Sequence, residues 1–500
     1  MKLEKILKNC QSKFTVENFK NINLKGISTY SNEIRDNFLF GAIKGKNFNG
    51  ENFIKDLILF KNLVIVLSIK SNSKIYKENT NITIIKTENV RKLIAEIAYF
   101  YYPKSLNEIV AVTGTNGKTS VAEYTRQIWN FQKISCCSIG TLGIIYKKKI
   151  LETSLTTPET CDINRNLSLL SKKGCKKAII EASSIGLDQN RLFPLKFNKV
   201  VFTNLTIDHL DYHKSFKEYK SSKGLLFKNY TTHTSLGIIN TDSKYSHFFL
   251  DICKKNNVEV IDFGKNAKFL KICKINKLNN KFEVYLSVKK KKFNIFFEGF
   301  SVFEIYNKIC ALLIVFGKGL KEKDLKIIKK LKNPPGRIEK ISNKKDLNIF
   351  IDYAHTPDAL KNVLSSLKES CTGKLITIIG CGGERDKLKR PLMTKEALKL
   401  SDKIIITDDN PRNEDPQKIR KEMISKIPQK KLIHIKEIPN RKKAIQYCIY
   451  ILEKNDFLLI AGKGHENYQI IKNKKFFFSD KETVIELINK WKKYVLEPRR

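Results

Sequence analysis

The feature that most constrains the fold is an apolar run leading directly into a glycine-containing loop. The run covers residues 109–112, and the loop reads Gly-Thr-Asn-Gly-Lys-Thr-Ser over 114–120. Its glycines can adopt backbone angles that side chains forbid, so the loop amides can turn toward an anion. Lys118 can then reach the outer phosphates of a nucleotide, and the Thr119 hydroxyl can face Mg²⁺. Strand, loop and helix in this order predict a phosphate-binding loop; the alternative is a polar turn that happens to contain Gly and Lys.

Length and charge limit the classes of protein to consider. A chain of 500 residues is too long for one core and predicts about three domains. The formal net charge is +44, but the lysines are spread over the whole chain, and the short runs at 147–149 and 289–292 are typical of hairpin tips. This spread argues against specific nucleic-acid binding, although the charge would attract an anionic substrate.

Cysteine spacing and apolar run length indicate the compartment. The 11 cysteines include no C-x-x-C pair, so neither a zinc site nor a disulfide framework is expected. Residues 1–10 lack the apolar block of a signal peptide, and the longest apolar runs, such as 63–67, are far shorter than a membrane span. We therefore expect a cytoplasmic protein without a membrane span, and we expect a monomer.

Polar residues follow further apolar runs in the middle of the chain. The run 177–180 ends at Glu181, and the run 200–205 leads into Asp-His-Leu-Asp-Tyr-His at 208–213. Open α/β sheets place ligands at the carboxyl ends of their strands, so Glu181 is a candidate Mg²⁺ ligand. A single histidine is more often a satisfied polar residue than a ligand, but the ordered series favours one nucleotide site.

The last third of the chain repeats this pattern after a break. Residues 334–337, Pro-Pro-Gly-Arg, stop any helix and predict a hinge. Strands alternating with helical stretches then predict a parallel sheet with ligands at one edge, and ordinary strand-to-helix turns are the alternative interpretation. The apolar runs are 347–351, 374–379, 403–406 and 457–460, and the polar turns after them are 352–358, 380–393, 407–412 and 461–469.

These motifs together resemble the Mur ligases. The spacing G-x-x-G-K at 114–118 is shorter than in most phosphate loops and is similar to that family's ATP loop. Thr-Thr-Pro at 156–158, Glu-x-Ser-Ser at 181–184 and Asp-His-x-Asp-Tyr-His at 208–213 stand in the family's order and spacing, and 352–358 matches its third-domain signature at every position. The family members use ATP as a substrate and Mg²⁺ as a cofactor, so the resemblance implies both here.

The resemblance implies an α/β fold of three domains. The expected domains are a small α/β domain at 1–107 that binds the UDP-muramoyl substrate, a central P-loop domain with a parallel sheet at 108–335 that binds ATP, and a Rossmann-like domain at 336–500 that binds an amino acid.

The resemblance also assigns candidate site residues. Lys223 corresponds to the lysine that reacts with CO₂ to form a carbamate, which requires a neutral, partly desolvated amine. His355 is a candidate base for the incoming amine, or an orienting residue. The expected ATP residues are Gly114, Thr115, Asn116, Gly117, Lys118, Thr119, Ser120, Asn240, Arg337 and Asp352, and the expected metal ligands are Thr119, Glu181, His209 and Lys223. The expected UDP-muramoyl residues are Thr29, Ser31, Lys46, Asn47, Phe48, Thr156, Thr157, Ser183, Gln189 and Arg191.

The acceptor amino acid is indicated by residues 409–412, Asp-Asn-Pro-Arg, which resemble the motif of the members that add meso-diaminopimelate to UDP-N-acetylmuramoyl-L-alanyl-D-glutamate. Diaminopimelate carries a second carboxylate that lysine lacks, and two guanidinium groups can bind it, with Glu466 for the ammonium. The implied activity is an ATP-dependent amide ligase of peptidoglycan precursor synthesis, which serves cell-wall biogenesis, cell shape and cell division. The expected acceptor residues are Arg385, Asp409, Asn410, Pro411, Arg412, Gly462 and Glu466.

Four departures from the family pattern, Tyr30, Asn32, Ile185 and Glu304, leave a non-catalytic relative open. Folylpolyglutamate synthetases share the loop and the ligase chemistry but give no reason for the motif at 409–412. A basic nucleic-acid-binding ATPase would explain the charge and the loop, yet it leaves the motifs of the last third unexplained.

Overall fold

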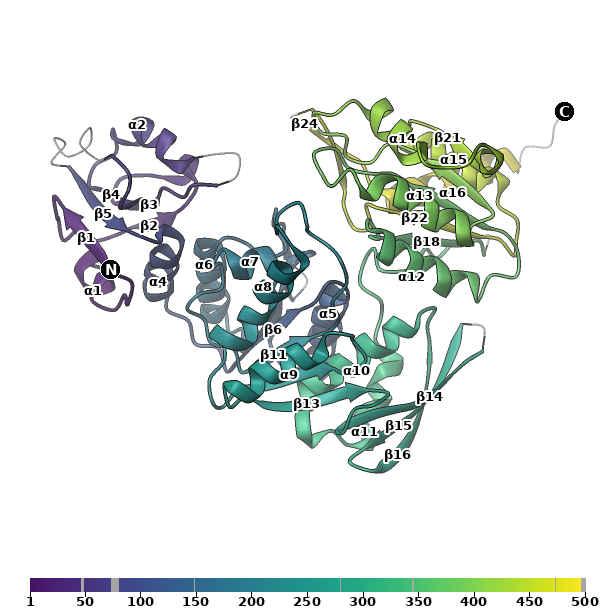
Figure 1. Cartoon of the computed structure of the whole chain (residues 1–500), viewed down its shortest axis with the longest axis horizontal. Helices are drawn as coiled ribbons and strands as arrows, with labels where there is room; N and C mark the ends of the chain where they lie inside the picture. The colour runs from purple at the N-terminus through teal and green to yellow at the C-terminus, as the bar shows by residue number, and fades with distance from the viewer. Residues whose placement is uncertain are drawn as a thin grey trace.

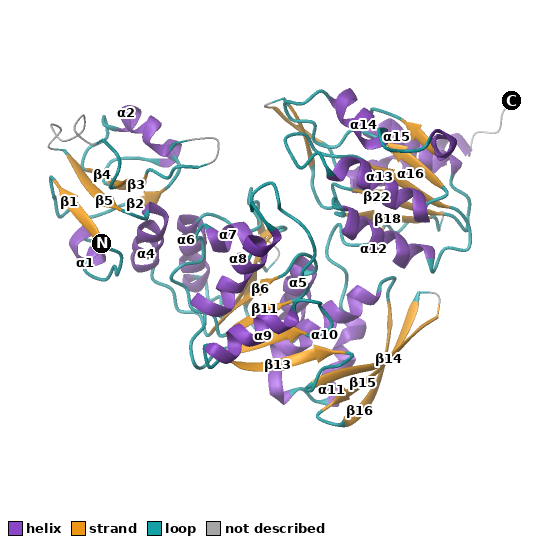
Figure 2. Ribbon diagram, viewed as in Figure 1, coloured by secondary structure: helices purple, strands orange, loops and turns teal. Residues whose placement is uncertain are grey.

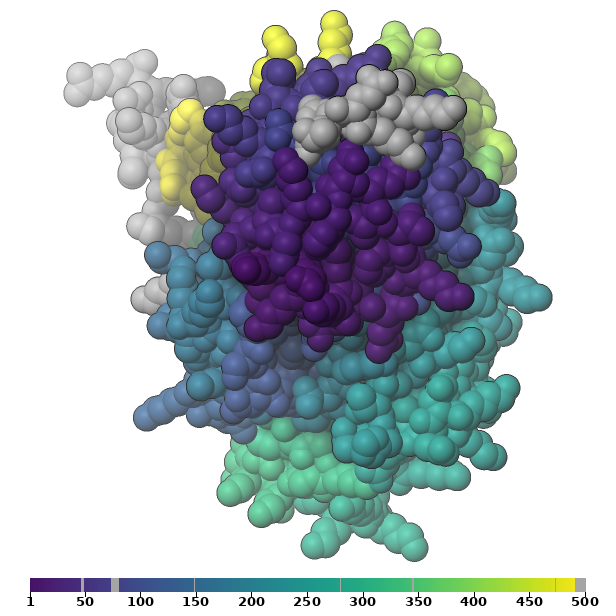
Figure 3. Space-filling view, turned by 90° about the vertical axis from the view of Figure 1, so that its left-hand side faces the viewer, coloured from purple at the N-terminus to yellow at the C-terminus, as the bar shows by residue number. Residues whose placement is uncertain are grey.

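The computed structural model describes residues 1–45, 49–72, 81–147, 149–278, 280–343, 346–472 and 474–495. Three large sheets follow one another along the chain, each with its own helices (Figure 1). Seen from the amino-terminal side, the amino-terminal domain lies in front of the central one (Figure 3). The predicted α/β fold of three domains is confirmed.

The amino-terminal domain is a small sheet with one long helix. Its strands are β1 Phe14–Glu17, β2 Gly26–Ser28, β3 Phe38–Gly41, β4 Leu63–Ser68 and β5 Ile82–Thr87. Its helices are α1 Leu3–Leu7, η1 Ser31–Glu33, η2 Gly50–Phe53, α2 Ile54–Leu57 and α4 Val90–Tyr101. The order is β1-β5-β4-β3-β2, and only β1 is antiparallel to its neighbour. Apolar residues of α1 and α4 pack together against this sheet.

The central domain is built on an 11-stranded mixed sheet. Its strands are β6 Glu108–Thr113, β7 Cys136–Gly140, β8 Gly143–Tyr146, β9 Lys149–Leu151, β10 Lys177–Glu181, β11 Lys199–Phe202, β12 Leu236–Asn240, β13 Glu259–Gly264, β14 Leu270–Leu278, β15 Lys281–Val288 and β16 Lys291–Glu298. The order is β16-β15-β14-β13-β12-β11-β6-β10-β7-β8-β9. Pairing is parallel from β7 to β14 and antiparallel at both ends. Of the predicted hairpin tips, Lys147 follows β8 and Lys149 begins β9, and residues 289–290 join β15 to β16.

Helices cover both faces of the central sheet (Figure 2). They are α5 Lys118–Phe131, α6 Thr160–Lys172, α7 Ser184–Asp188, α8 Phe216–Asn229, α9 Ser246–Lys255, α10 Val302–Phe316, η3 Gly317–Gly319, α11 Glu322–Leu325 and η4 Lys326–Lys330. Alternate residues of a strand face opposite sides. Accordingly, Val110 and Val112 join a core with α5 and α10, whereas Ala111 joins one with α6, α8 and α9. The phosphate-loop strand is thus buried on both sides.

The carboxyl-terminal domain has a six-stranded sheet and a separate hairpin. Its strands are β17 Glu339–Lys340, β18 Asn348–Asp352, β19 Leu375–Ile379, β20 Lys403–Ile406, β21 Ile435–Glu437, β22 Phe457–Ala461, β23 Tyr468–Ile471 and β24 Lys474–Phe477. Its helices are α12 Pro357–Lys368, α13 Lys389–Leu400, α14 Pro416–Ile424, η5 Gln429–His434, α15 Arg441–Ile451 and α16 Asp480–Val495. The order is β17-β18-β22-β19-β20-β21, parallel except for β17, as alternating strands and helices predicted.

The segment between the last two large sheets is fixed by its own backbone contacts. Gly336 has φ +67°, and a Cβ there would lie 2.4 Å from the His465 nitrogen. The Asp352 carboxylate accepts the N–H groups of Ile338 and Ala354, both at 2.7 Å. The predicted hinge is therefore held against β18 and the turn after β22. Among the described residues, we find no helix with the length and apolar character to cross a bilayer.

A buried ion pair between α15 and α16 leads to a stability prediction. Arg441 Nε and Nη2 donate to the two carboxylate oxygens of Asp480 at 2.7 and 2.8 Å, and neither side chain is exposed. Asp480→Ala leaves a buried guanidinium without its counter-charge, so we expect a loss of about 3–5 kcal/mol in the free energy of unfolding of this domain. Denaturant unfolding would measure the loss.

The control for this prediction lies on the same helix. Glu486 accepts from Lys442 at 2.9 Å and from Lys490 at 2.6 Å, and these pairs are exposed. Since exposed ion pairs contribute little to stability, Glu486→Ala should leave the unfolding midpoint nearly unchanged. Equal midpoints for the two variants would contradict the role given to the buried pair.

Candidate active site

The phosphate loop joins β6 to α5 in a conformation that requires glycine. Gly114 has φ +154° and Gly117 has φ +89°. A Cβ at Gly114 would lie 1.9 Å from Thr203 Oγ1, so no larger residue fits. Lys118 Nζ donates to the carbonyls of Gly114 and Thr115, both at 2.9 Å. Burial lowers the pKa of Lys118, although Glu181 and Asp208 oppose the shift. The loop thus presents a cation at the amino end of a helix, where an anion is favoured.

Glu181, the last residue of β10, is the centre of a buried hydroxyl network. Its Oε1 accepts the Thr141 N–H at 2.9 Å, and its Oε2 accepts the hydroxyls of Thr141 at 3.1 Å and Thr119 at 3.0 Å. The residue is 2% exposed. Arg337, from the carboxyl-terminal domain, donates from Nη2 to Thr119 Oγ1 at 3.2 Å. The carboxylate therefore collects contacts from two loops of the central domain, one of which is held by the hinge segment.

Lys223 and His209 lie near the same loop. Lys223 Nζ, on α8, donates to the Gly114 carbonyl at 2.8 Å, and the residue is 1% exposed. Burial, together with the charge of Lys118, lowers the pKa of Lys223 well below its usual value. His209 has φ +54°, and its Nε2 lies 3.5 Å from Asp208 Oδ2. Burial lowers the pKa of His209. Lys223 is therefore not a solvated surface lysine, unlike most lysines of this basic chain.

The four candidate metal ligands can be compared with the chemistry of Mg²⁺. Among the described residues, no three His, Cys, Asp or Glu side chains are grouped so as to hold a metal ion. Of the four candidates only Glu181 and His209 are of these types. Mg²⁺ prefers oxygen ligands, and the Glu181 carboxylate and Thr119 hydroxyl already meet at 3.0 Å. These two residues fit the ion best.

The predicted UDP-muramoyl residues of the central domain form one cluster. The Thr157 hydroxyl donates to the Glu181 carbonyl at 2.7 Å and lies 2.9 Å from Ser183 Oγ. Arg191 Nη1 donates to the Thr157 carbonyl at 2.8 Å, and its Nη2 donates to Gln189 Oε1 at 2.6 Å. Thr156 is linked to Thr141 by a hydroxyl contact of 3.2 Å. This polar cluster lies directly beside the network around Glu181.

The amino-terminal domain adds a smaller part of this surface. A cavity of about 200 Å³ is bordered by Tyr30, by Asp162 and Arg165 of α6, and by residues after β9. Ser31 begins the short helix η1, and Thr29 directly precedes Tyr30. The candidates Lys46, Asn47 and Phe48 lie outside the described residues. The departure Tyr30 therefore borders the cavity between the domains.

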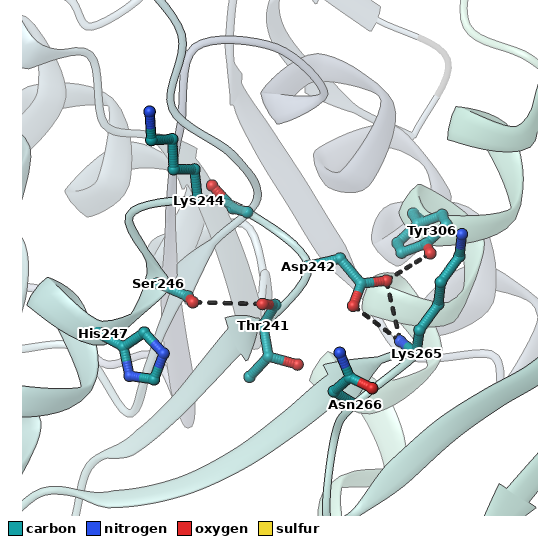
Figure 4. Close-up of a pocket in the computed structure, with 9 residues that line it drawn as sticks. Thr241, Asp242, Lys244, Ser246, His247, Lys265, Asn266 and Tyr306 are labelled. Carbon is teal, nitrogen blue, oxygen red and sulfur yellow. Dashed lines mark hydrogen bonds between the residues drawn. The ribbon is translucent and has the colours of Figure 1, made fainter.

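A second pocket, of about 460 Å³, lies at the carboxyl end of β12 (Figure 4). Asp242 Oδ2 accepts the Tyr306 hydroxyl at 2.5 Å, and the Asp242 carboxylate also accepts the Lys265 N–H. Asn240 Nδ2 donates to the Thr203 carbonyl at 2.8 Å, and its Oδ1 accepts the Asp242 N–H at 3.1 Å. Asn240 thus connects this pocket to the phosphate-loop side.

The residues predicted to bind the acceptor amino acid meet around Asn410 in the carboxyl-terminal domain. Its Nδ2 donates to Glu466 Oε2 at 2.9 Å, and its Oδ1 accepts Lys463 Nζ at 3.3 Å. Lys463 is completely buried and also lies 3.3 Å from Glu466 Oε2. Burial raises the pKa of Glu466, and Lys463 opposes the shift. Gly462, with φ +113°, lets the backbone pass beside Asp409, whose Oδ2 would lie 2.8 Å from a Cβ there.

Two guanidinium groups stand next to this cluster. Arg412 Nη1 donates to the Gly383 carbonyl at 2.7 Å, after Pro411. Burial and the charge of Arg385 lower the pKa of Arg412. Within the described part of the chain, neither arginine has a carboxylate within ion-pair distance. Arg385 is exposed and Arg412 half-buried, so together they form a cationic patch that can receive a carboxylate.

His355 lies three residues beyond the end of β18, in the turn before α12. Its Nδ1 is 2.8 Å from the Tyr353 carbonyl, which accepts, so Nδ1 carries the hydrogen and Nε2 is the basic nitrogen. The ring reaches solvent, but the surrounding protein and the charge of Lys389 lower the pKa of His355 to about 4. The ring is therefore neutral at pH 7. It is a weak base, suited to accepting a hydrogen bond more than to holding a proton.

Three contact residues were given no role from the sequence. Lys463 and His465 lie inside the turn 461–469, and Thr141 lies in no motif. His465 Nε2 is 3.0 Å from the Thr141 carbonyl, 324 positions away, and joins the last two domains. The only sequence signal for Lys463 was its place between two glycines after a strand. The contact between Thr141 and His465 leaves no signal in the sequence, because the two residues are so far apart along the chain.

Two family models match the chain: Mur ligase middle domain over residues 112–315, and Mur ligase, glutamate ligase domain over 336–464. A UDP-N-acetylmuramoyl-L-alanyl-D-glutamate–2,6-diaminopimelate ligase from Rickettsia rickettsii is 38% identical over 477 residues, covering 94% of this chain and 97% of the relative. The protein of the same name from Aquifex aeolicus is 36% identical, covering 93% and 94%.

Solved structures give the same result. A structure of UDP-N-acetylmuramoyl-L-alanyl-D-glutamate–2,6-diaminopimelate ligase aligns with a TM-score of 0.66 at 27% identity, covering 98% of this chain and 99% of that one. MurF ligase from Thermotoga maritima in complex with ADP aligns with a TM-score of 0.61 at 17% identity, covering 95% and 100%, and shares the fold. By its similarity to these proteins over nearly its whole length, the chain belongs to the Mur ligase family.

Proposed function

We propose that this protein adds meso-2,6-diaminopimelate to the D-glutamate of UDP-N-acetylmuramoyl-L-alanyl-D-glutamate, with ATP converted to ADP and phosphate. The observation that carries the proposal is the cationic patch of Arg385 and Arg412 beside the Asn410–Glu466 pair. Relatives that are 35–38% identical carry the name of this ligase. The reaction belongs to peptidoglycan precursor synthesis and so serves cell-wall biogenesis, cell shape and division. We place it in the cytoplasm, with a monomeric enzyme and small-molecule partners only.

The acceptor site suits an amino acid with two charged ends. The far carboxylate of diaminopimelate would bind Arg412 and Arg385, and its ammonium would bind Glu466, with Asp409 and Gly462 bordering the same end. Lysine has no second carboxylate and would leave two neighbouring cations uncompensated. Loss of one partner from a charge-paired contact costs about 2–5 kcal/mol, which is enough to discriminate between the two amino acids.

The first chemical step activates a carboxylate, which is a poor electrophile. A carboxylate oxygen of the D-glutamate side chain attacks the γ-phosphorus of ATP, and ADP leaves. Lys118 would face the phosphates, and Arg337 would approach them from the hinge. Asn240 and Asp352 would border the nucleotide. Positioning and positive charge would therefore supply most of the rate acceleration of this step. When bound by Thr119 and Glu181 with His209, Mg²⁺ would supply further positive charge for the phosphates.

In the second step the free amine of diaminopimelate attacks the acyl carbon. A tetrahedral intermediate forms, phosphate leaves, and the nitrogen loses a proton to give the amide. His355 would accept a hydrogen bond from the amine through Nε2, because its Nδ1 is bound to the Tyr353 carbonyl. We assign it to orienting the amine, with proton acceptance as its second possible role, since its pKa of about 4 makes a weak base.

We further propose that Lys223 carries a carbamate. The buried amine of Lys223 and the ammonium of Lys118 both donate to the Gly114 carbonyl, at 2.8 and 2.9 Å, so two like charges would crowd one acceptor. Burial lowers the pKa of Lys223, which favours the neutral form that a lysine needs in order to attack CO₂. The new N–C bond forms as one C–O π bond of CO₂ becomes a carboxylate, and the nitrogen releases one proton to solvent. The product is an anion, which would turn the repulsion from Lys118 into attraction and could offer oxygen to Mg²⁺.

The acceptor assignment predicts a substrate preference. Phosphate release with UDP-muramoyl-dipeptide and ATP should be at least about 100-fold faster with meso-diaminopimelate than with L-lysine, measured as kcat/KM. Arg412→Met should lower kcat/KM for diaminopimelate by about 30-fold to 1,000-fold and leave the slow lysine rate unchanged.

The matched control for Arg412 is Lys399→Met, which removes an exposed cation from α13 of the same domain and should leave both rates unchanged. Equal wild-type rates with the two amino acids, or a preference for lysine, would overturn the proposed function. An Arg412→Met enzyme with wild-type selectivity would remove only the role of that arginine.

The carbamate assignment predicts chemical rescue. Lys223→Ala should lower kcat by at least about 10–100-fold, and millimolar formate or acetate should restore part of the loss, because a short carboxylate can occupy the place of the carbamate. Lys217→Ala, on the exposed side of the same helix, should match the wild type. An unaffected rate for Lys223→Ala would show that no carbamate is needed.

A further inference from the structure

We propose that His465 is a positioning residue that couples a seated acceptor amino acid to the Glu181 network at the phosphate loop. The inference rests on the proposed ligase function, and it concerns how the two halves of that reaction communicate. In the structure, the last two domains are linked at this point by a hydrogen bond between the His465 ring and the Thr141 backbone.

The direction of this hydrogen bond is fixed by its partner. A carbonyl oxygen only accepts, so His465 Nε2 must carry the hydrogen that it shares with Thr141 at 3.0 Å. Nδ1 of the ring is buried and has no hydrogen-bond partner among the described residues. The neutral tautomer with hydrogen on Nε2 satisfies this arrangement, whereas the opposite tautomer would leave both ring nitrogens unsatisfied. His465 therefore acts as a single directed donor.

Thr141 is in turn hydrogen-bonded to Glu181. It lies in the turn between β7 and β8, and both its N–H and its hydroxyl bind the Glu181 carboxylate, at 2.9 and 3.1 Å. Gly140 brings the backbone so close that a Cβ there would lie 2.1 Å from Glu181 Oε1. A turn packed this tightly cannot shift its carbonyl without moving its N–H. A contact that fixes the Thr141 carbonyl therefore also fixes the Thr141 groups that donate hydrogen bonds to Glu181.

Within the carboxyl-terminal domain, His465 packs tightly against the hinge segment at 334–337. A Cβ at Gly336 would lie 2.4 Å from the His465 nitrogen, and one at Gly464 would lie 2.8 Å from Tyr353 Cβ. The His465 ring packs against Tyr353 with 5.3 Å between centroids, and the Arg337 guanidinium lies 4.9 Å from the same Tyr353 ring. His465 and Arg337 therefore move as one body with the carboxyl-terminal domain.

The two residues reach the same carboxylate by separate routes. Arg337 donates to Thr119, and His465 donates to Thr141; both threonines donate to Glu181. Both hydrogen bonds, Arg337 to Thr119 and His465 to Thr141, form at the same position of the carboxyl-terminal domain. A shift of the domain breaks both together, because Arg337 and His465 are packed on one tyrosine.

Glu466, the residue after His465, connects this chain of contacts to the proposed acceptor site. Glu466 follows His465 directly, its N–H is bound to the Lys463 carbonyl at 3.0 Å, and its carboxylate is held by Asn410. An amino acid bound at Glu466 would stabilise this one-turn segment and with it the ring of His465. Because the same segment then fixes Thr141, phosphoryl transfer from ATP to the substrate carboxylate would be favoured when the acceptor is in place.

The test compares two substitutions with opposite effects on the donor. His465→Phe keeps a ring but removes the N–H, whereas His465→Gln keeps a side-chain N–H. We expect His465→Phe to lower kcat with diaminopimelate by about 10–100-fold with little change in its KM, and to abolish the acceleration of phosphate release that diaminopimelate causes in the wild type. His465→Gln should recover at least about tenfold of the lost kcat.

Two further variants separate coupling from folding. His434→Phe, an exposed histidine of η5, should behave as the wild type. Thr141→Val removes the hydroxyl that binds Glu181, and its effect on kcat should not add to that of His465→Phe, because both break one chain of contacts. The double-variant measurement keeps the proposal open to test even if His465→Phe lowers the melting temperature.

The outcomes are distinguishable from those of the proposed function. If the wild type shows no diaminopimelate-dependent phosphate release, the ligase assignment fails. If the wild type is active while His465→Phe retains its kcat and its acceleration, or while the effects of His465→Phe and Thr141→Val multiply independently, the positioning role fails. A His465→Gln enzyme as impaired as His465→Phe would also overturn it.

Discussion

The carboxylate of Glu181 is buried in the middle of the molecule, and the surrounding loops are arranged to satisfy it. A buried carboxylate without hydrogen-bond donors is strongly unfavourable. Here the donors are the Thr119 hydroxyl and two groups of Thr141. Thr119 follows the glycine-containing loop, and Thr141 directly follows Gly140; a Cβ at Gly114 would clash with Thr203, and one at Gly140 would clash with Glu181. The close approach of the Thr141 donors to this carboxylate thus explains the glycine at position 140, whereas the glycine at position 114 is required by the packing of Thr203.

The charges around this carboxylate are mostly positive, which suits a site for phosphate. Lys118 and Lys223 share the Gly114 carbonyl, and Arg337 reaches Thr119 from the next domain. Burial lowers the pKa of both lysines, since each must be desolvated next to another cation. An arrangement that costs stability in the free protein is useful when a polyanion binds, because the anion then neutralises charges that are already in place.

The strands and the polar turns after them could be predicted, because a buried β-branched run and the residues that follow it are local signals. Residues 177–180 and 457–460 lie in strands, and Glu181 and Glu466 lie at or just beyond their ends. The family resemblance named Lys223 as a candidate metal ligand, but only the structure shows its burial and its contact with Gly114. The contact between Thr141 and His465 had no signal, because it joins a backbone carbonyl to a ring 324 positions away. Backbone carbonyls are present at every residue, so a sequence cannot mark the one that is used.

Dividing the site among domains makes the chemistry conditional on their arrangement. The loop at 114–120 and Glu181 belong to the central domain, whereas Arg337, Glu466 and the two arginines proposed to bind the acceptor belong to the last domain. Neither part alone presents both an activated carboxylate and an amine. Since an acyl phosphate is hydrolysed by water, an enzyme gains by forming it only when the amine is present. A rigid contact such as the one between His465 and Thr141 meets this requirement with a single hydrogen bond, because tight packing on either side turns a small domain shift into the loss of two carboxylate donors.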